Sequence, residues 1–123
     1  MKRILIVEDH SALAEVEQLI CTIEGYDVRV FHSGEEGIAD YDQFQPHLVI
    51  LDLVLAGDMT GYEVVNRLAK KSWPTKILIV SGQIGPAGIP EFGSLDYVQT
   101  LAKPFDNAEL IRRIGRMLDA DAA

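Results

Sequence analysis

The sequence predicts an α/β domain in which helices cover both faces of a five-stranded parallel sheet, a doubly wound (βα)5 fold. Three observations support this prediction. Short apolar runs recur along the chain, segments of helical periodicity alternate with them, and three of the runs are apolar on both alternating faces. Strands of that kind are typical of a sheet covered by helices on both sides. Because crossovers between such strands are right-handed, we expect the sheet to be parallel.

The five predicted strands are apolar runs of four to six residues. The runs at 4–7, 48–51 and 77–80 consist of Ile, Leu and Val alone, the composition that favours buried strands. The runs at 28–31 and 97–102 are weaker, because polar residues interrupt them. Together they provide the five strands of one sheet.

Four helical patterns follow the first three strands and the fifth. In residues 11–24, the apolar residues on one helical face are Leu13, Val16, Leu19, Ile20 and Ile23. Ser33 and Glu36 form a capping box that begins a short helix toward Phe44. A third helix is predicted over about 61–71. The last begins at Asp106, and its predicted buried residues are Leu110, Ile111, Ile114, Met117 and Leu118.

The segment after the fourth strand does not fit the helical pattern. Between residues 82 and 93 the helix-breaking residues are Gly82, Gly85, Pro86, Gly88, Pro90 and Gly93. In a helix interior Pro costs roughly 3 kcal/mol and Gly roughly 1 kcal/mol relative to Ala. We therefore predict a loop with at most one or two short turns, so that the fourth helix of the fold is degenerate or missing.

Length and charge restrict the function classes. A chain of 123 residues, 48% of them apolar, is expected to form one domain over residues 1–123 with its own core. The single cysteine, Cys21, lies in an apolar stretch and is interpreted as a packing residue in a reducing compartment. No run approaches the length of a signal-peptide core or a membrane span, so we expect a cytoplasmic protein without membrane association. The net charge of −8 opposes direct binding to nucleic acid.

Chemically active side chains follow the predicted strands at the ends where open parallel sheets bind ligands. Glu8 and Asp9 follow the first strand, Asp52 the third, Ser81 the fourth and Lys103 the fifth. Carboxylates about 5 Å apart repel by roughly 3 kcal/mol per pair at an effective dielectric near 20, and a divalent cation relieves that repulsion. Oxygen ligands without His or Cys suit Mg²⁺.

The same side chains fit phosphoryl transfer, whose transition state spreads negative charge over three equatorial oxygens. Mg²⁺ can neutralise one oxygen, the Lys103 ammonium a second, and the Ser81 hydroxyl with backbone N–H groups the third. Asp52, from the central strand, is the expected acceptor, because a carboxylate can form a covalent aspartyl phosphate.

Each of these residues also has a structural interpretation. Asp9 can cap the following helix, Ser81 and Gly82 form a common turn dipeptide, and Lys103 with Pro104 can form a surface turn. Five residues of suitable chemistry at the ends of neighbouring strands favour the functional interpretation over these separate ones.

These motifs resemble the receiver domain of two-component response regulators over essentially the whole chain. The matching segments are Ile4-Leu5-Ile6-Val7-Glu8-Asp9, Leu51-Asp52-Leu53 followed by Gly61, Ile79-Val80-Ser81-Gly82 and Lys103-Pro104-Phe105. The resemblance implies a flavodoxin-like fold with strand order 2-1-3-4-5. It also implies that a histidine kinase or a histidine phosphotransfer protein donates the phosphoryl group, and that an output protein or domain reads the phosphorylated state.

The resemblance assigns a role to each matching residue. Asp52 would accept the phosphoryl group, and Mg²⁺ would be bound by Glu8, Asp9, Asp52 and the backbone carbonyl of Val54. Ser81 and Lys103 would contact the phosphoryl group. The Lys103–Pro104 peptide bond is expected to be cis. No catalysis is expected beyond phosphorylation and dephosphorylation of the domain's own aspartate.

The chain departs from the family pattern in three places. The loop over residues 53–61 is about one residue longer, with Ala56 where a proline is common. Thr100 stands at the switch position that usually carries an aromatic ring, and that ring usually acts together with the hydroxyl residue, here Ser81. The segment 82–93 replaces the fourth helix.

Three other protein types are alternatives to a phosphorylation switch. A pseudo-receiver that only docks onto partners would lack phosphoryl uptake, although this chain has every residue of the site. Flavodoxins share the fold but need a Ser/Thr/Gly loop for the flavin phosphate, where this chain has Glu8-Asp9-His10. Haloacid dehalogenase-type phosphatases carry an Asp-x-Asp pattern after the first strand, which Glu8-Asp9 does not match.

Overall fold

The computed structural model describes residues 1–82, 89–93 and 95–119. The elements in chain order are β1 (Arg3–Val7), α1 (Ser11–Ile23), β2 (Asp27–Phe31), α2 (Gly34–Phe44), β3 (Leu48–Leu51), α3 (Gly61–Leu68), β4 (Lys76–Ser81), the 3₁₀ helix η1 (Pro90–Phe92), β5 (Val98–Ala102) and α4 (Asn107–Asp119). The five strands are all parallel and lie in the order β2-β1-β3-β4-β5. The predicted doubly wound sheet and its strand order are confirmed.

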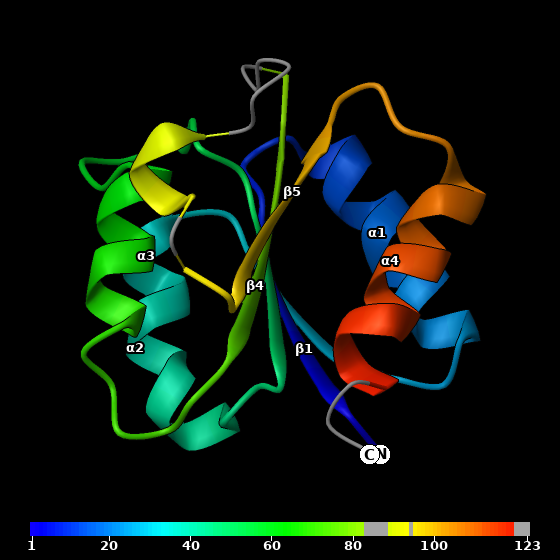
Figure 1. Ribbon diagram of the computed structural model, residues 1–123, viewed down its shortest axis with the longest axis horizontal. Helices are drawn as coiled ribbons and strands as arrows, with labels where there is room; N and C mark the ends of the chain where they lie inside the picture. Colours follow the sequence, from blue (N-terminus) through cyan, green and yellow to red (C-terminus); the bar gives the residue numbers. More distant parts are fainter. Residues whose placement is uncertain (83–88, 94, 120–123) are drawn as a thin grey trace.

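Helices cover both faces of the sheet and create two apolar cores. Helices α2 and α3 lie on one face, together with η1, and α1 and α4 lie on the other (Figure 1). On the α2/α3 face, the buried strand residues are Leu5, Val7, Val49, Leu51, Ile77 and Ile79. On the α1/α4 face, they are Ile4, Ile6, Leu48, Ile50, Leu78, Val80 and Leu101. Successive strand residues therefore alternate between two buried layers, which explains the uninterrupted apolar runs.

The predicted helix starts agree with the structure because the capping side chains make the expected contacts. The Ser33 Oγ accepts a hydrogen bond from the Glu36 N–H at 3.3 Å, which confirms Ser33 as the cap, and it donates one to the Glu36 carboxylate at 2.9 Å. Thr60 caps α3 by accepting from the Glu63 N–H at 3.2 Å. The first helix of the α2/α3 layer ends at Phe44 as predicted, and α3 ends earlier than predicted, at Leu68.

The predicted apolar face of α1 is buried only in part: Leu13 is half-buried, and Ile20 is half-buried against the α1/α4 core. Val16, Leu19 and Ile23 are 42%, 61% and 70% exposed. The helix instead buries Ala14, Glu17 and Cys21, which recur at helical spacing. Two of these three are small, so α1 can lie close against β1 and β2, whereas Val16, Leu19 and Ile23 are left exposed. Cys21 is fully buried, as predicted for a packing residue.

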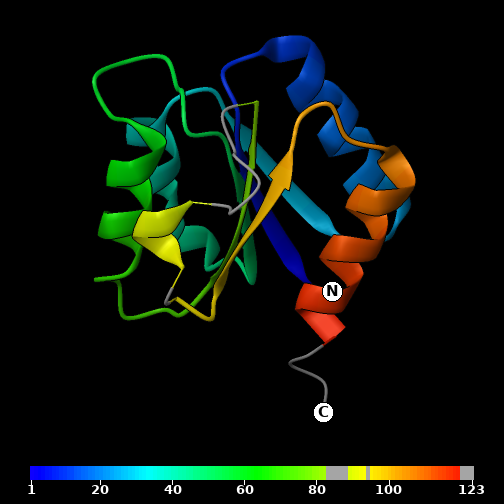
Figure 2. The same cartoon turned by 45° about the horizontal axis from the view of Figure 1, so that its top comes forward.

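The segment between β4 and β5 agrees with the prediction where it is described. Among residues 82, 89–93 and 95–97 the only helical element is the single 3₁₀ turn η1; residues 83–88 lie outside the described residues. Figure 2 shows η1 beside α3, where the Phe92 ring lies 5.6 Å from that of Tyr62. Ile89 and Phe92 are buried in the α2/α3 core. This turn therefore covers part of the sheet face that a full helix would cover.

Within the described part of the chain, no helix combines the length and the apolar character that crossing a membrane requires.

In α4, the buried residues are Leu110, Ile114, Met117 and Leu118, as predicted, whereas Ile111 is only half-buried.

Candidate functional site: a carboxylate cluster at the strand ends

The alternation of the strands places three of the predicted residues in one layer. Glu8 follows Ile4 and Ile6 of β1 at the same spacing, and Asp52 follows Leu48 and Ile50 of β3. By the same alternation Lys103 continues the side of β5 occupied by Leu101. These three side chains therefore extend from the ends of β1, β3 and β5 over the α1/α4 layer, at the carboxyl edge of the sheet.

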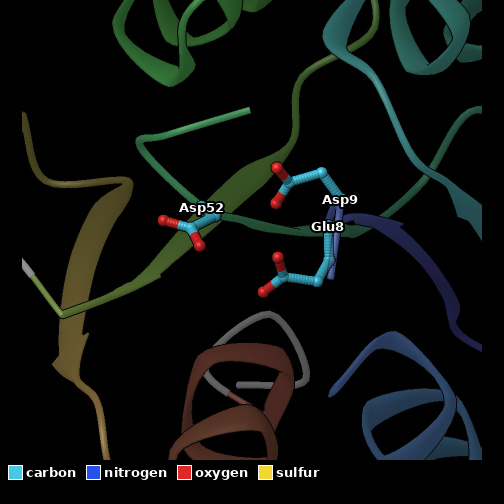
Figure 3. A group of neighbouring side chains, drawn as sticks. All are labelled: Glu8, Asp9 and Asp52. Atoms are coloured by element: carbon cyan, nitrogen blue, oxygen red, sulfur yellow. The ribbon is translucent and has the colours of Figure 1, made fainter. Parts of the chain in front are cut away.

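Three carboxylates meet at this edge. Glu8 is 2% exposed and Asp52 9% exposed, whereas Asp9 is more exposed than either. One oxygen from each of the three lies within 4.8 Å of the others, and Figure 3 shows the Glu8 and Asp9 carboxylates extending toward Asp52. A group of hard oxygen donors at this spacing suits Mg²⁺, which prefers carboxylate and water ligands. The residues present therefore fit a divalent cation.

Lys103 binds two of these carboxylates directly. Its Nζ donates to Glu8 Oε1 at 2.9 Å and to Asp52 Oδ2 at 2.6 Å. Burial raises the pKa of Glu8, although hydrogen bonds from Lys103 and from the His10 N–H oppose that rise. Burial acts to lower the pKa of Lys103, but the hydrogen bonds to Asp52 and Glu8 outweigh it, so this pKa lies above its ordinary value. The ammonium therefore stays charged and holds the two acids together.

The other residues predicted for the site lie in the loop after β3, at the end of β4, in β5 and just after it. Ser81 ends β4 and is buried, and its carbonyl accepts from the Lys103 backbone N–H at 3.0 Å. The Lys103–Pro104 bond is cis, as the resemblance implied. Val54 is exposed, and its N–H donates to Asp52 Oδ1 at 3.3 Å. Thr100 lies within β5, half-buried, and its carbonyl accepts from the Arg113 side chain at 2.8 Å.

A cleft of about 680 Å³ opens beside the carboxylates. Its lining residues are Glu8, Asp9, His10, Leu13, Val16, Asp52, Val54, Lys103, Pro104, Phe105 and Asn107. The lining combines the three carboxylates and Lys103 with apolar side chains of α1 and of the segment after β5, namely Leu13, Val16, Pro104 and Phe105. A partner that approaches Asp52 through this cleft therefore meets an apolar wall beside the charged centre.

The loop after Asp52 is fixed at both of its ends. Gly57 has a φ of +91°, which an L side chain rarely adopts, and Glu35 of α2 accepts from the Met59 N–H at 3.0 Å. At the far end, the Gly61 N–H donates to the Leu53 carbonyl at 2.9 Å. The loop over residues 53–61 is thus attached to the start of α2.

Glu17 is a further acid near the site that sequence reasoning did not identify. It is fully buried in α1, and neither carboxylate oxygen has a hydrogen-bond partner among the described residues. Burial, followed by the charge of Glu8, raises its pKa to about 8. The signal in the sequence was weak, because a glutamate in an amphipathic helix is normally assigned to the solvent face.

Comparison with known proteins identifies the family. The family model of the response regulator receiver domain matches residues 4–115. The "Cell cycle response regulator CtrA" of Brucella ovis is 40% identical over 118 residues, covering 91% of this chain and 48% of the relative. The chain therefore spans about half the length of the curated relatives it matches.

Solved structures agree with this assignment. A putative response regulator from Chloroflexus aurantiacus has a TM-score of 0.84 at 32% identity, covering 95% of this chain and 97% of that one. A CheY-like receiver domain protein from Methanospirillum hungatei has a TM-score of 0.86 at 28% identity, covering 98% and 95%. The chain belongs to the response regulator receiver domain family of two-component signalling.

Proposed function

We propose that Asp52 accepts a phosphoryl group and that this chain is a phosphorylation-dependent switch. The observation that carries the proposal is the position of Lys103, whose ammonium bonds both Asp52 and Glu8 inside a cluster of three carboxylates. That arrangement supplies an acceptor, a cation that neutralises phosphoryl oxygens and ligands for a metal. Phosphoryl transfer depends mainly on such positioning and charge neutralisation.

Each neighbouring group has a separate task in this proposal. Glu8, Asp9, Asp52 and the Val54 carbonyl hold Mg²⁺, which supplies charge neutralisation at the transferred phosphoryl group. Ser81 donates its hydroxyl to a phosphoryl oxygen, and Lys103 exchanges its bond to Asp52 for one to another phosphoryl oxygen. Because the phosphoryl group interacts with these side chains differently in different conformations, it shifts an equilibrium between two states of the domain.

The proposed setting is a cytoplasmic two-component pathway. A histidine kinase or a histidine phosphotransfer protein donates the phosphoryl group, and an output protein or domain responds. Residues 1–123 form one receiver unit, with no direct contact to nucleic acid or membrane. The only catalysis is phosphorylation and dephosphorylation of Asp52, and the switch positions are Ser81 and Thr100.

Intact-mass measurement tests the proposal. We expect incubation with a small acyl phosphate and Mg²⁺ to add the mass of one phosphoryl group to the wild-type chain. Asp52→Asn abolishes the addition, because the amide is neither a nucleophile of comparable strength nor a full metal ligand. Chelation of Mg²⁺ with EDTA prevents it as well.

Asp58→Asn is the matched control, since Asp58 is an exposed acid in the same loop and its removal changes the charge equally. This variant keeps full phosphoryl uptake. If the wild-type chain gains no mass from either a small donor or a phosphorylated histidine protein, the proposal is wrong and a docking module that is never phosphorylated is the better description.

A further inference from the structure

Glu17 combines two features that a stable core residue rarely has together. Its side chain is 0% exposed, and both of its carboxylate oxygens lack a hydrogen-bond partner among the described residues. Buried acids are normally paired, because an unsatisfied polar group in the interior costs free energy. Such a group is therefore expected to have a partner in some other state of the molecule.

The position of Glu17 points to the carboxylate cluster. It shares the inner face of α1 with Ala14 and Cys21, and lies one turn closer than Cys21 to the start of that helix. The helix begins three residues after Glu8, at the carboxyl edge of the sheet, and covers the same layer as Glu8 and Lys103. The charges of Glu8, Lys103 and Asp52 all act on Glu17. Glu17 is thus a fourth carboxyl group behind the site.

Lys103 is the group that has to move when a metal binds. Its ammonium now bonds Glu8 Oε1 and Asp52 Oδ2, and both of these carboxylates belong to the cluster that fits a divalent cation. Two cations that share the same oxygens repel each other strongly in a buried site. An ammonium displaced from Glu8 therefore needs a new acceptor, and leaving it buried without one is costly.

We propose that Glu17 is a positioning residue that accepts the Lys103 ammonium when a divalent cation occupies Glu8, Asp9 and Asp52. Lys103 then alternates between two acids, Glu8 without metal and Glu17 with metal. In the metal-bound state, Lys103 then stays beside Asp52 instead of turning to solvent, where it would be lost as a contact for the phosphoryl group. The inference rests on the proposed function only for the assignment of the metal ligands.

Binding of Mg²⁺ alone, followed by NMR of the amides after Glu8 and Asp52, tests the role of Glu17. We expect Glu17→Met to weaken Mg²⁺ binding by about tenfold, because the displaced ammonium loses one charge-assisted hydrogen bond. Glu17→Gln keeps an acceptor oxygen without the charge and should show a smaller loss. Glu15→Gln, which removes an exposed acid from the same helix, should bind Mg²⁺ as the wild-type chain does.

The Lys103→Met background separates an effect through the lysine from a direct effect of the Glu17 charge on the metal. With no ammonium to relocate, Glu17→Met should leave the Mg²⁺ affinity of Lys103→Met unchanged. An equal loss in both backgrounds would overturn the inference, and so would unchanged affinity in Glu17→Met.

The Lys103 side chain provides a second readout that does not depend on affinity. In the wild-type chain, saturating Mg²⁺ should move the Lys103 Cε and Nζ resonances to a new ordered position. In Glu17→Met the same resonances should approach those of a solvated lysine. If the wild-type chain binds no Mg²⁺, the metal site of the proposed function is wrong and this inference is wrong with it; Mg²⁺ binding without any Glu17 effect would overturn the inference alone.

Discussion

The free energy of unfolding of the wild-type chain is expected to fall by roughly 4–5 kcal/mol between acidic and alkaline pH because of Glu17. Replacing Glu17 is expected to remove this fall. The carboxyl has a pKa of about 8 in the folded chain, against 4.5 for the unfolded reference. The folded state therefore binds the proton more tightly. The stability associated with the protonated acid is fully present below pH 4.5, falls as the pH rises and is lost above about pH 8. Because the side chain is fully buried, solvent does not screen this effect.

Urea denaturation at pH 5 and pH 9 in EDTA measures the difference. The wild-type chain should lose several kcal/mol more over this interval than Glu17→Gln or Glu17→Met, a large share of a typical domain stability of about 5–15 kcal/mol. Glu17→Gln introduces a polar side chain and Glu17→Met an apolar one, and neither can titrate. A weaker pH dependence in both variants would therefore be caused by the loss of the titrating carboxyl group. Glu15→Gln should retain the wild-type pH dependence; if Glu17→Gln also retains it, Glu17 is not a buried neutral acid.

Gly61→Ala is expected to destabilise the domain by at least about 3 kcal/mol, through a clash between backbone atoms. A β-carbon at Gly61 would overlap the carbonyl oxygen of Asp52 and lie 2.5 Å from Leu53 Cα. These are backbone atoms, so no side chain can move aside. Relief requires α3 to shift away from the end of β3, which breaks the hydrogen bond from the Gly61 N–H to Leu53 and displaces Asp52.

Gly115→Ala is the control for this substitution. Gly115 lies inside α4, and a β-carbon there would have no atom within 4 Å outside its own helix. This exchange should stabilise the chain by up to about 1 kcal/mol, since Ala is a better helix former. Chemical denaturation of both variants, with intact-mass measurement of phosphoryl uptake, provides the comparison. Equal stability of Gly61→Ala and the wild-type chain would contradict the close contact between α3 and the Asp52 backbone.

Local patterns in the sequence predicted most of the fold because they depend on neighbours within a few residues. The apolar runs predicted the strands, and the capping pair Ser33 and Glu36 predicted the start of α2. The glycines and prolines after β4 predicted the lack of a regular helix in the described residues there. The site was predictable for a related reason: strand ends in a parallel sheet share one edge, so Glu8, Asp52 and Lys103 could be expected to lie together.

The orientation of α1 was not predictable in this way. Its sequence has two stripes that could face the sheet, and the more apolar stripe, with Leu19 and Ile23, was the natural choice. The structure buries the other one, because Ala14 and Cys21 are small enough to let the helix lie close to the strands. That choice depends on the shape of the sheet surface, which is absent from the local pattern.

The sequence by itself determined the strands, the edge at which they carry chemistry and the identities of the acids, the hydroxyl and the amine found there. Only the tertiary structure decided which acids the Lys103 ammonium binds, and that Glu17 lies buried behind them with no hydrogen-bond partner among the described residues. The physical reason is that burial and pairing depend on which surfaces meet, whereas strand propensity and capping depend on residues next to each other in the chain.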